Sequence, residues 1–253
     1  MAAAFTFLRR LKPNRFRPYR LHRESYSTNP KQDSRGIVSP TLHQRCGICW
    51  AISTVRHFAA IIKRYGYIAE DEQLSIQDLV QQVHALHPEV CNSPDYSLDD
   101  VLLAESILRE SGICVERRNR LSYDFDSLKN HKPTTRKYTI RHMDVVYSEN
   151  YLGDKFEKGL LRALKRSPVA CSVRMFPSYH IIKGKDLYDP DMSNEVERPS
   201  LHMMLLVASG KTKKRQPFLE FQDSFGHTVG DNGFVRVRGG RGIVADYVRI
   251  TPA

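Results

Sequence analysis

The sequence has few cysteines, no long apolar run and no internal repeat, and each absence excludes a class of protein. Its five cysteines, an odd number in 253 residues, are too sparse for a disulfide scaffold, so at least one thiol is predicted to be free. No stretch reaches the roughly 18 apolar residues that a membrane-spanning helix needs. No Asn-x-Ser/Thr acceptor for N-glycosylation occurs, which agrees with a protein outside the secretory route. We therefore expect a soluble globular protein with no membrane partner.

Composition and length are those of a globular protein. Hydrophobic residues make up 41% of the chain and charged residues 26%, and 253 residues can bury the core of one large domain or two small ones. The net charge of +11 is concentrated at the N-terminus. Residues 1–35 carry nine basic and two acidic side chains, or +7, which leaves +4 for the other 218 residues. Because the body of the protein has so little excess charge, no nucleic acid partner is expected for it.

The N-terminal segment, residues 1–32, is predicted to be a basic, disordered arm, and residues 33–253 are predicted to form the folded domain. The arm is rich in arginine and poor in acidic residues. Its apolar residues, Ala2 to Leu8, precede the charges and are too few for a secretory signal, so no such signal is recognised. An organelle transit peptide or a plain basic tail fits this composition, and the compartment stays open. A nucleic-acid-associated function would rest on this arm alone.

The rest of the chain divides into a helical half and a strand-rich half. In the first half apolar residues recur at helical spacing, whereas short β-branched or aromatic runs bounded by Gly, Pro and polar residues dominate the second. The expected helices are 48–65, 75–86, 98–111 and 153–165, and the expected strands are 136–147, 168–176, 201–210, 217–225, 233–240 and 245–251. This order predicts an α+β fold of two packed lobes, with a pocket where the lobes meet.

The stretch "HQRCGICWAIS" places Cys49 at the start of the first helical pattern, where three chemistries compete. The pair Cys46-x-x-Cys49 at a helix start is typical of a redox site, but that interpretation requires a preceding buried strand, and "VSPTLHQR" is not one. A zinc site could use His43, Cys46 and Cys49 with the later set His84, His87 and Cys91. The spacing of the later set is irregular for structural zinc. No metal or cofactor is therefore predicted, and a nucleophilic cysteine is the favoured interpretation.

The nucleophile hypothesis is supported by a resemblance that covers most of the chain. "CGICW" matches the pattern Cys-Gly-[Ser/Ala]-Cys-[Trp/Tyr] at all positions except Ile48. The further segments "LSIQDLV", "SLHMMLLVASG" and "FLEFQDSFGHTVGDNGFVRVRGG" follow in the order expected for the same family. From about Asp33 to the C-terminus, the chain thus resembles the papain-like cysteine peptidases.

This resemblance implies the fold and the roles of four catalytic residues. The fold would have a helical N-terminal lobe, an antiparallel β-rich C-terminal lobe, and the active site in the cleft between them. Cys49 would be the nucleophile, His202 the general base and acid, and Asp223 the group that orients the imidazole. The side-chain amide of Gln44 would form the oxyanion hole together with the Cys49 N–H. A helix start and an imidazolium both favour the thiolate that such a reaction needs.

The resemblance also implies substrate contacts and one disulfide. The substrate-binding residues would be Gly47, Trp50, Ser93, Pro94, Leu201 and Phe225. Cys46 would bridge to Cys91. The expected function is a cysteine-type endopeptidase that acts on peptides or proteins as a monomer.

Four departures from the family pattern motivate an alternative, a catalytically impaired papain-like protein that binds or regulates. Gln44 lies five positions before Cys49, one fewer than usual. Ser93 and Pro94 replace two glycines that present backbone to the substrate. Asp223 replaces an asparagine, and Phe225 a tryptophan.

Overall fold

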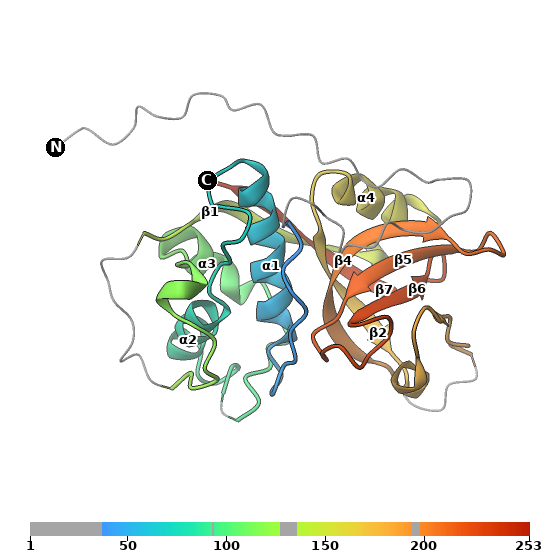
Figure 1. Cartoon of the computed structure of the whole chain (residues 1–253), viewed down its shortest axis with the longest axis horizontal. Coiled ribbons are helices and arrows are strands. Elements are labelled where there is room, and N and C mark those ends of the chain that lie inside the picture. Colours follow the sequence, from blue (N-terminus) through green and yellow to red (C-terminus); the bar gives the residue numbers. More distant parts are fainter. Residues whose placement is uncertain (1–36, 93, 127–135, 194–197) are drawn as a thin grey trace.

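The computed structural model describes residues 37–92, 94–126, 136–193 and 198–253. Within them the chain forms two lobes, one of helices and one dominated by a sheet (Figure 1). The predicted arm, residues 1–32, and its boundary with the domain lie outside the described residues. So does Ser93. The α+β class and the two-lobed arrangement expected from the sequence are confirmed.

Three helices build the first lobe: α1 (Cys49–Arg64), α2 (Ile76–Leu86) and α3 (Leu103–Glu110). Helix α1 lies between the lobes, and almost all of its residues are buried for that reason. It ends where the sequence predicts, because Gly66 adopts a left-handed φ of +73° that few other residues tolerate. Helix α2 begins as predicted at Ser75, whose hydroxyl accepts a hydrogen bond from the Asp78 N–H at 2.9 Å.

Helix α3 is shorter than its apolar pattern predicts. The expected helix begins at residue 98, whereas α3 begins at Leu103. The difference has a local cause. The Asp100 carboxylate accepts a hydrogen bond from the Leu102 N–H at 2.9 Å, a short-range turn that competes with helix formation.

The described residues contain one sheet of seven strands in the order β1-β7-β2-β4-β5-β6-β3. The strands are β1 (Ile140–Tyr147), β2 (Val169–Met175), β3 (Leu187–Tyr188), β4 (Ser200–Lys211), β5 (Pro217–Gln222), β6 (Phe234–Arg238) and β7 (Val244–Pro252). All pairings are antiparallel except that of β3 with β6. Helix α4 (Lys155–Leu164) packs against this sheet. Six strands and α4 were expected, but β3 was not, since two residues carry no readable periodicity.

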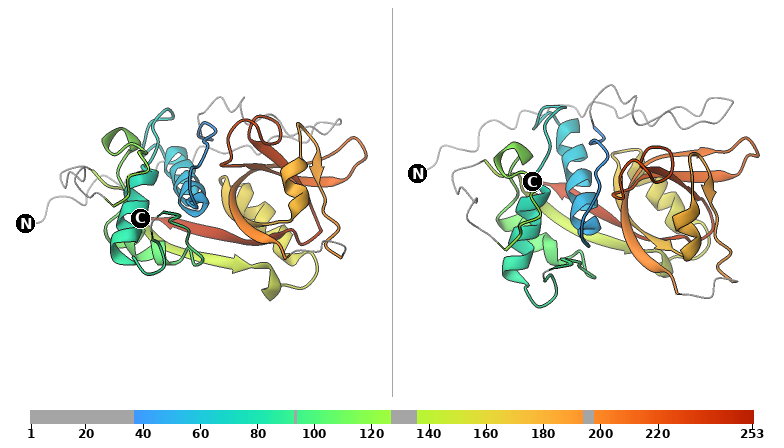
Figure 2. Two further views of the ribbon diagram at one scale, coloured as in Figure 1. Left: turned by 90° about the horizontal axis from the view of Figure 1, so that it is seen from below. Right: turned by 60° about the horizontal axis from the view of Figure 1, so that its bottom comes forward.

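Each lobe has its own hydrophobic core, and β4 joins them. Apolar residues of α1, α2 and α3 form one cluster, while α4 and the inner faces of β2, β4, β5 and β6 form another. In Figure 2 the strands of the second lobe curve round on themselves, while β1 and β7 extend beneath the helices of the first lobe. At the junction Ser53 of α1 donates a hydrogen bond to the Met203 carbonyl of β4 at 2.9 Å. The start of α1 is thereby fixed against β4.

Among the helices of the described residues, none has the length and apolar character required to cross a membrane.

Candidate active site

Cys49 is the first residue of α1 and lies at the interface between the lobes. The helix begins there without a side-chain cap, because its N-cap residue is Ile48. Unpaired N–H groups and the helix dipole at such a position favour a negative charge. The thiol is therefore placed where a thiolate is stabilised.

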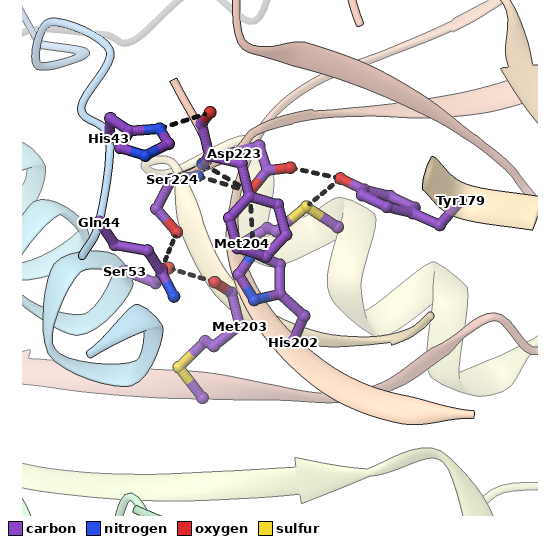
Figure 3. A network of polar contacts seen from close by, with 10 residues as sticks. His43, Gln44, Ser53, Tyr179, His202, Met203, Met204, Asp223 and Ser224 are labelled. Atoms are coloured by element: carbon purple, nitrogen blue, oxygen red, sulfur yellow. Dashed lines mark hydrogen bonds and ion pairs between the residues drawn. The ribbon is translucent and has the colours of Figure 1, made fainter. Parts of the chain in front are cut away.

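His202 of β4 faces Cys49, and Asp223 follows β5 directly behind it. The register of the sheet positions the imidazole, since His202 pairs with Val173 of β2 near the start of β4. The imidazole makes a side-chain hydrogen bond with Cys49. Its Nε2 lies 2.8 Å from Oδ1 of Asp223 (Figure 3). The three predicted catalytic side chains are thus brought into one chain of contacts.

The electrostatics of this chain favour a thiolate and an imidazolium. Burial alone would raise the pKa of the Cys49 thiol, but the hydrogen bond and charge of His202 outweigh it, so that this pKa lies below its usual value. Burial alone would lower the pKa of His202, yet its hydrogen bonds with Asp223 and Cys49 raise the pKa to about 9. Both shifts favour the thiolate and imidazolium forms of the pair over the neutral forms.

The Asp223 carboxylate is fully buried and accepts hydrogen bonds from several donors. Besides His202, they are the Tyr179 hydroxyl at 2.5 Å, the Ser224 N–H at 2.5 Å and the Phe225 N–H at 3.3 Å. Burial alone would raise the pKa of Asp223, but these donors and the positive charge of His202 hold it below its usual range. The carboxylate thus stays ionised and can orient the imidazole through neutral pH.

Tyr179 is a member of this site that the sequence analysis missed. It lies in a short 3₁₀ helix, Pro177–Ile181, and is 1% exposed. In the sequence, a tyrosine that follows Pro-Ser carries no motif that distinguishes it from an ordinary aromatic residue of the core. Its link to the site arises only when this 3₁₀ helix packs beside the residues that follow β5.

Replacing Tyr179 with phenylalanine is expected to lower the free energy of unfolding by about 1.5–3 kcal/mol, because a buried carboxylate loses a hydroxyl donor. Urea unfolding at neutral pH would measure the change. Tyr188→Phe is the matched control, since the Tyr188 hydroxyl bonds the uncharged backbone of Phe176 and Arg174. Its expected cost is about 0.5–1.5 kcal/mol. A smaller loss for Tyr179→Phe than for Tyr188→Phe would contradict the assigned role.

Phe225 covers the imidazole on one face. The two rings stack with centroids 4.5 Å apart and planes 11° from parallel. Phe225 is in turn fixed by a β-bridge to His43, whose Nδ1 lies 2.9 Å from the Phe225 carbonyl oxygen. The phenyl ring therefore shields the contact between His202 and Asp223 from water, although it is smaller than the indole of the family pattern.

Gln44 is held against the same loop by two hydrogen bonds. Its backbone N–H donates to the Ser224 carbonyl at 2.7 Å, and its Oε1 accepts from the Ser224 hydroxyl at 2.5 Å. With Oε1 occupied, the amide nitrogen is the group left to donate to a ligand (Figure 3). The shortened loop before Cys49 thus still places the Gln44 side chain beside the site.

The predicted substrate-binding residues differ in their accessibility. Leu201 is 60% exposed next to His202, and Pro94 is also exposed. The Gly47 N–H donates to the Asp95 carbonyl at 2.6 Å, and a Cβ at Gly47 would lie 2.8 Å from both Asp95 carboxylate oxygens. That Cβ would also lie 2.8 Å from the Ser97 Cβ, so any side chain at this position would force a neighbour to shift.

Trp50, by contrast, is 2% exposed, and its Nε1 donates to the Tyr96 carbonyl at 2.9 Å. Burial leaves it almost no surface for a substrate. Its observed role is to pack the start of α1.

The predicted disulfide between Cys46 and Cys91 is not formed. All five cysteines are free thiols. The Cys91 thiol points instead to the Tyr96 carbonyl oxygen, 3.7 Å away. Cys46 nevertheless packs against the same cluster of buried residues as Cys91. Cys46 and Cys91 thus belong to the same cluster but are not bonded to each other.

The histidines of the zinc alternative have other partners, and His87 has its Nδ1 3.6 Å from a Glu89 carboxylate oxygen. His84 has its Nδ1 2.6 Å from the Cys91 carbonyl oxygen and its Nε2 3.1 Å from an Asp126 oxygen. His43 contacts the Phe225 carbonyl. Within the described part of the chain, no group of three or more His, Cys, Asp or Glu side chains could hold a metal ion.

Solved structures share this fold at low sequence identity. The proform of the Amb a 11 cysteine protease, a major ragweed pollen allergen, matches with a TM-score of 0.67 and 20% identity over 85% of this chain, which spans 63% of the allergen chain. Procathepsin B S9 from Trypanosoma congolense matches with a TM-score of 0.70 and 16% identity, covering 93% of this chain and 82% of its own. The bromelain protease from Ananas comosus gives 0.65 and 17%, covering 85% and 94%.

A comparison with curated proteins finds no significant match. The sequence pattern of the papain family cysteine proteases, however, matches residues 27–249, which is most of the chain. The fold, the order of the sequence segments and this match agree, and the chain therefore belongs to the papain family of cysteine proteases.

Proposed function

We propose that the protein is a cysteine-type endopeptidase that hydrolyses peptide bonds through an acyl-enzyme. One observation carries the proposal: Cys49 at a helix start, His202 and a buried, fully bonded Asp223 form a continuous chain. Family membership supports a peptide or protein substrate. The sequence departures do not remove any chemical group that the reaction needs.

The proposed reaction begins with the ionised pair. The Cys49 thiolate attacks the scissile carbonyl carbon and forms a C–S bond, while the carbonyl π electrons move onto oxygen. The Cys49 N–H and the Gln44 amide donate hydrogen bonds to that oxyanion. When the tetrahedral intermediate collapses, the C–N bond breaks and His202 gives its proton to the leaving amine. A thioester of Cys49 remains.

In the second half of the reaction, the now neutral His202 acts as a base. It takes a proton from a water molecule, whose oxygen attacks the thioester carbonyl carbon. The intermediate collapses with cleavage of the C–S bond, which releases the carboxylic acid product and restores the thiolate and the imidazolium. Asp223 stays ionised throughout and keeps the ring oriented.

A catalytically impaired binding protein is the second candidate, and the surroundings of Pro94 and Gly47 favour it. Pro94 has no backbone N–H to offer an extended peptide. The Gly47 N–H is already donated to Asp95. If these features dominate, the thiol would react with small agents while peptides bind weakly.

Two assays on the full chain separate these candidates. The first is labelling by an epoxide probe for cysteine-peptidase thiols, with the modified residue located by mass spectrometry. The second is cleavage of a peptide blocked at both termini, which an endopeptidase accepts. Labelling at Cys49 together with internal cleavage supports the peptidase. Labelling without cleavage indicates the binding protein, and absence of labelling rules out an activated Cys49.

Replacing Asp223 with asparagine is expected to move the alkaline limb of the kcat/KM profile to lower pH by at least about one unit. The active ion pair needs a protonated His202, so on the alkaline side it is lost as pH rises through the pKa of His202. In the parent that pKa is about 9, with Asp223 supporting it. A neutral amide removes this support, so the pKa falls toward the ordinary value of about 6.5.

The measurement is kcat/KM against pH for both proteins. Asp246→Asn is the matched control, because Asp246 is also a buried carboxylate but bonds Ser172 and is not among the groups that shift the pKa of His202. Its alkaline limb is expected to coincide with that of the parent. An unchanged limb in Asp223→Asn would show that Asp223 does not set the protonation of His202.

A further inference from the structure

Tyr123 has a left-handed backbone conformation, with a φ of +64°. A tyrosine in this conformation costs free energy, and such residues persist only where the surrounding structure enforces them. The group that enforces it is the buried side chain of Gln77 in α2. Its Oε1 accepts hydrogen bonds from the Ser122 N–H at 3.0 Å and the Tyr123 N–H at 3.3 Å, and its Nε2 donates to the Asp124 carbonyl at 2.6 Å. The turn that carries Tyr123 is therefore fixed to the first lobe.

The side chain of Tyr123 contacts both sequence neighbours of Gln44. Its hydroxyl donates a hydrogen bond to the His43 carbonyl at 2.9 Å. Its ring lies under the Arg45 guanidinium, whose central carbon is 5.1 Å from the ring centroid, in a cation–π contact. The residues immediately before and after Gln44 are therefore held by one side chain, although Tyr123 lies 80 positions from His43 in the sequence.

The segment around Gln44 is thereby attached to both lobes. Ser224, which follows β5 in the second lobe, bonds the backbone N–H and the side-chain oxygen of Gln44 (Figure 3). Tyr123 packs against the core cluster of the first lobe, the same cluster that Cys49 contacts. An oxyanion donor acts only at a set distance from the oxygen of the carbonyl that the nucleophile attacks. The contacts of Tyr123 hold the Gln44 segment against the lobe that carries this nucleophile.

We propose that Tyr123 is a positioning residue, which holds the chain on both sides of Gln44 and so places the side-chain amide as an oxyanion donor. The effect on the rate rests on the proposed peptidase function, whereas the placement of Gln44 does not. Because Tyr123 acts through the Gln44 segment, its loss should lower kcat while KM and the reactivity of the Cys49 thiol change little.

Steady-state kinetics of Tyr123→Phe in the full chain test the effect on the rate. This variant loses the hydroxyl but keeps the ring under Arg45. We expect kcat to fall about tenfold, with KM and the rate of Cys49 alkylation by iodoacetamide within about threefold of the parent. In a Gln44→Ala background the same substitution should lower kcat by less than about twofold, because the group that Tyr123 places is already absent. A further loss of about tenfold in that background would overturn the proposal.

Tyr138→Phe is the matched control, because Tyr138 makes the same two kinds of contact elsewhere. Its hydroxyl donates to the Tyr67 carbonyl at 3.4 Å, and its ring lies under the Arg136 guanidinium at 5.0 Å. Neither partner adjoins a predicted catalytic residue in the sequence. We expect Tyr138→Phe to leave kcat within about twofold of the parent. An equal loss of kcat in both variants would overturn the proposal, since it would indicate a general loss of stability rather than a displaced Gln44.

NMR spectra of the isotopically labelled full chain test the placement of Gln44 without any cleavage. The side-chain amide signals of Gln44 are identified by their loss in Gln44→Ala. Tyr123→Phe should shift or broaden these signals, and Tyr138→Phe should leave them unchanged. Arg45→Met removes the other contact and should change the same signals, and it decides the test if thermal unfolding shows that Tyr123→Phe is not folded. Unchanged Gln44 signals in the folded variants would overturn the proposal. A parent that cleaves no peptide but shows these changes would instead contradict the proposed function alone.

Discussion

Replacing Cys49 with serine is expected to abolish labelling by an epoxide probe and to lower kcat/KM for peptide cleavage by about 10⁴-fold or more. The hydroxyl is far less acidic than the thiol, so the ion pair with His202 is not formed. Without a thiolate the first bond of the proposed reaction cannot form at a useful rate. Mass spectrometry of labelled protein and a fluorogenic peptide assay would measure the two effects.

The selectivity of this result follows from the environments of the other thiols. Burial raises the pKa of Cys91 to about 11 and that of Cys114 to about 12. Burial also raises the pKa of Cys171 well above its usual value. The pKa of Cys46 is raised by burial and by the negative charge of Asp95. Among the five, only Cys49 has a lowered thiol pKa. At neutral pH it alone is expected to react as a thiolate.

Cys46→Ser is the matched control, because Cys46 is also partly exposed and lies only three residues from Cys49. Its labelling is expected to equal that of the parent. Cys114→Ser and Cys171→Ser should likewise retain the label, since their thiols are buried and protonated. Equal labelling of Cys49→Ser and the parent would mean that another group is the nucleophile.

The sequence predicted most of the fold because its helices and strands carry strong periodicity. The pattern from Ile48 to Gly66 corresponds to α1, and six β-branched runs correspond to six strands. The errors arose where local contacts override a pattern. The Asp100 turn delays α3, and β3 exists through its pairing with β6 rather than through its own two residues.

The candidate site was predictable to the extent that its residues lie in recognisable segments. Cys49, His202 and Asp223 were named from the sequence, and the structure brings them together. Tyr179 was not, since its contact with Asp223 crosses 44 positions and depends on the fold. The disulfide between Cys46 and Cys91 was inferred from the family pattern and is not formed. Residue types suggested the pair, but they do not specify where a thiol points.

The position of the Gln44 amide could not be predicted from the sequence, because the segment between Gln44 and Cys49 is one residue shorter than in the family pattern. A shorter loop could have withdrawn the amide from the oxyanion. The contacts of Gln44 argue otherwise. Its backbone and its side-chain oxygen both bond Ser224, the neighbour of Asp223. Both contacts hold Gln44 against the loop that carries Asp223, although the segment before Cys49 is one residue shorter.

Replacing Gln44 with alanine is therefore expected to lower kcat about 10²–10³-fold, as for a lost oxyanion donor in other hydrolases. KM should change little, because the oxyanion exists only in the transition state and the intermediate. Alkylation of Cys49 by iodoacetamide involves no oxyanion, and its rate should stay within about threefold of the parent. Steady-state kinetics and an alkylation time course would measure these quantities.

Two further variants decide whether the effect comes from the donor itself. Ser224→Ala removes the hydroxyl that holds the Gln44 oxygen but leaves the amide in place, so an intermediate loss of about tenfold in kcat is expected. Gln82→Ala removes an equivalent amide from α2, where it bonds Asp78, and should leave kcat unchanged. If Gln44→Ala slows alkylation as much as cleavage, Gln44 supports the thiolate or the fold instead. If it raises KM alone, the amide binds the substrate before the reaction begins. A fall in kcat alone is the result that only an oxyanion donor explains.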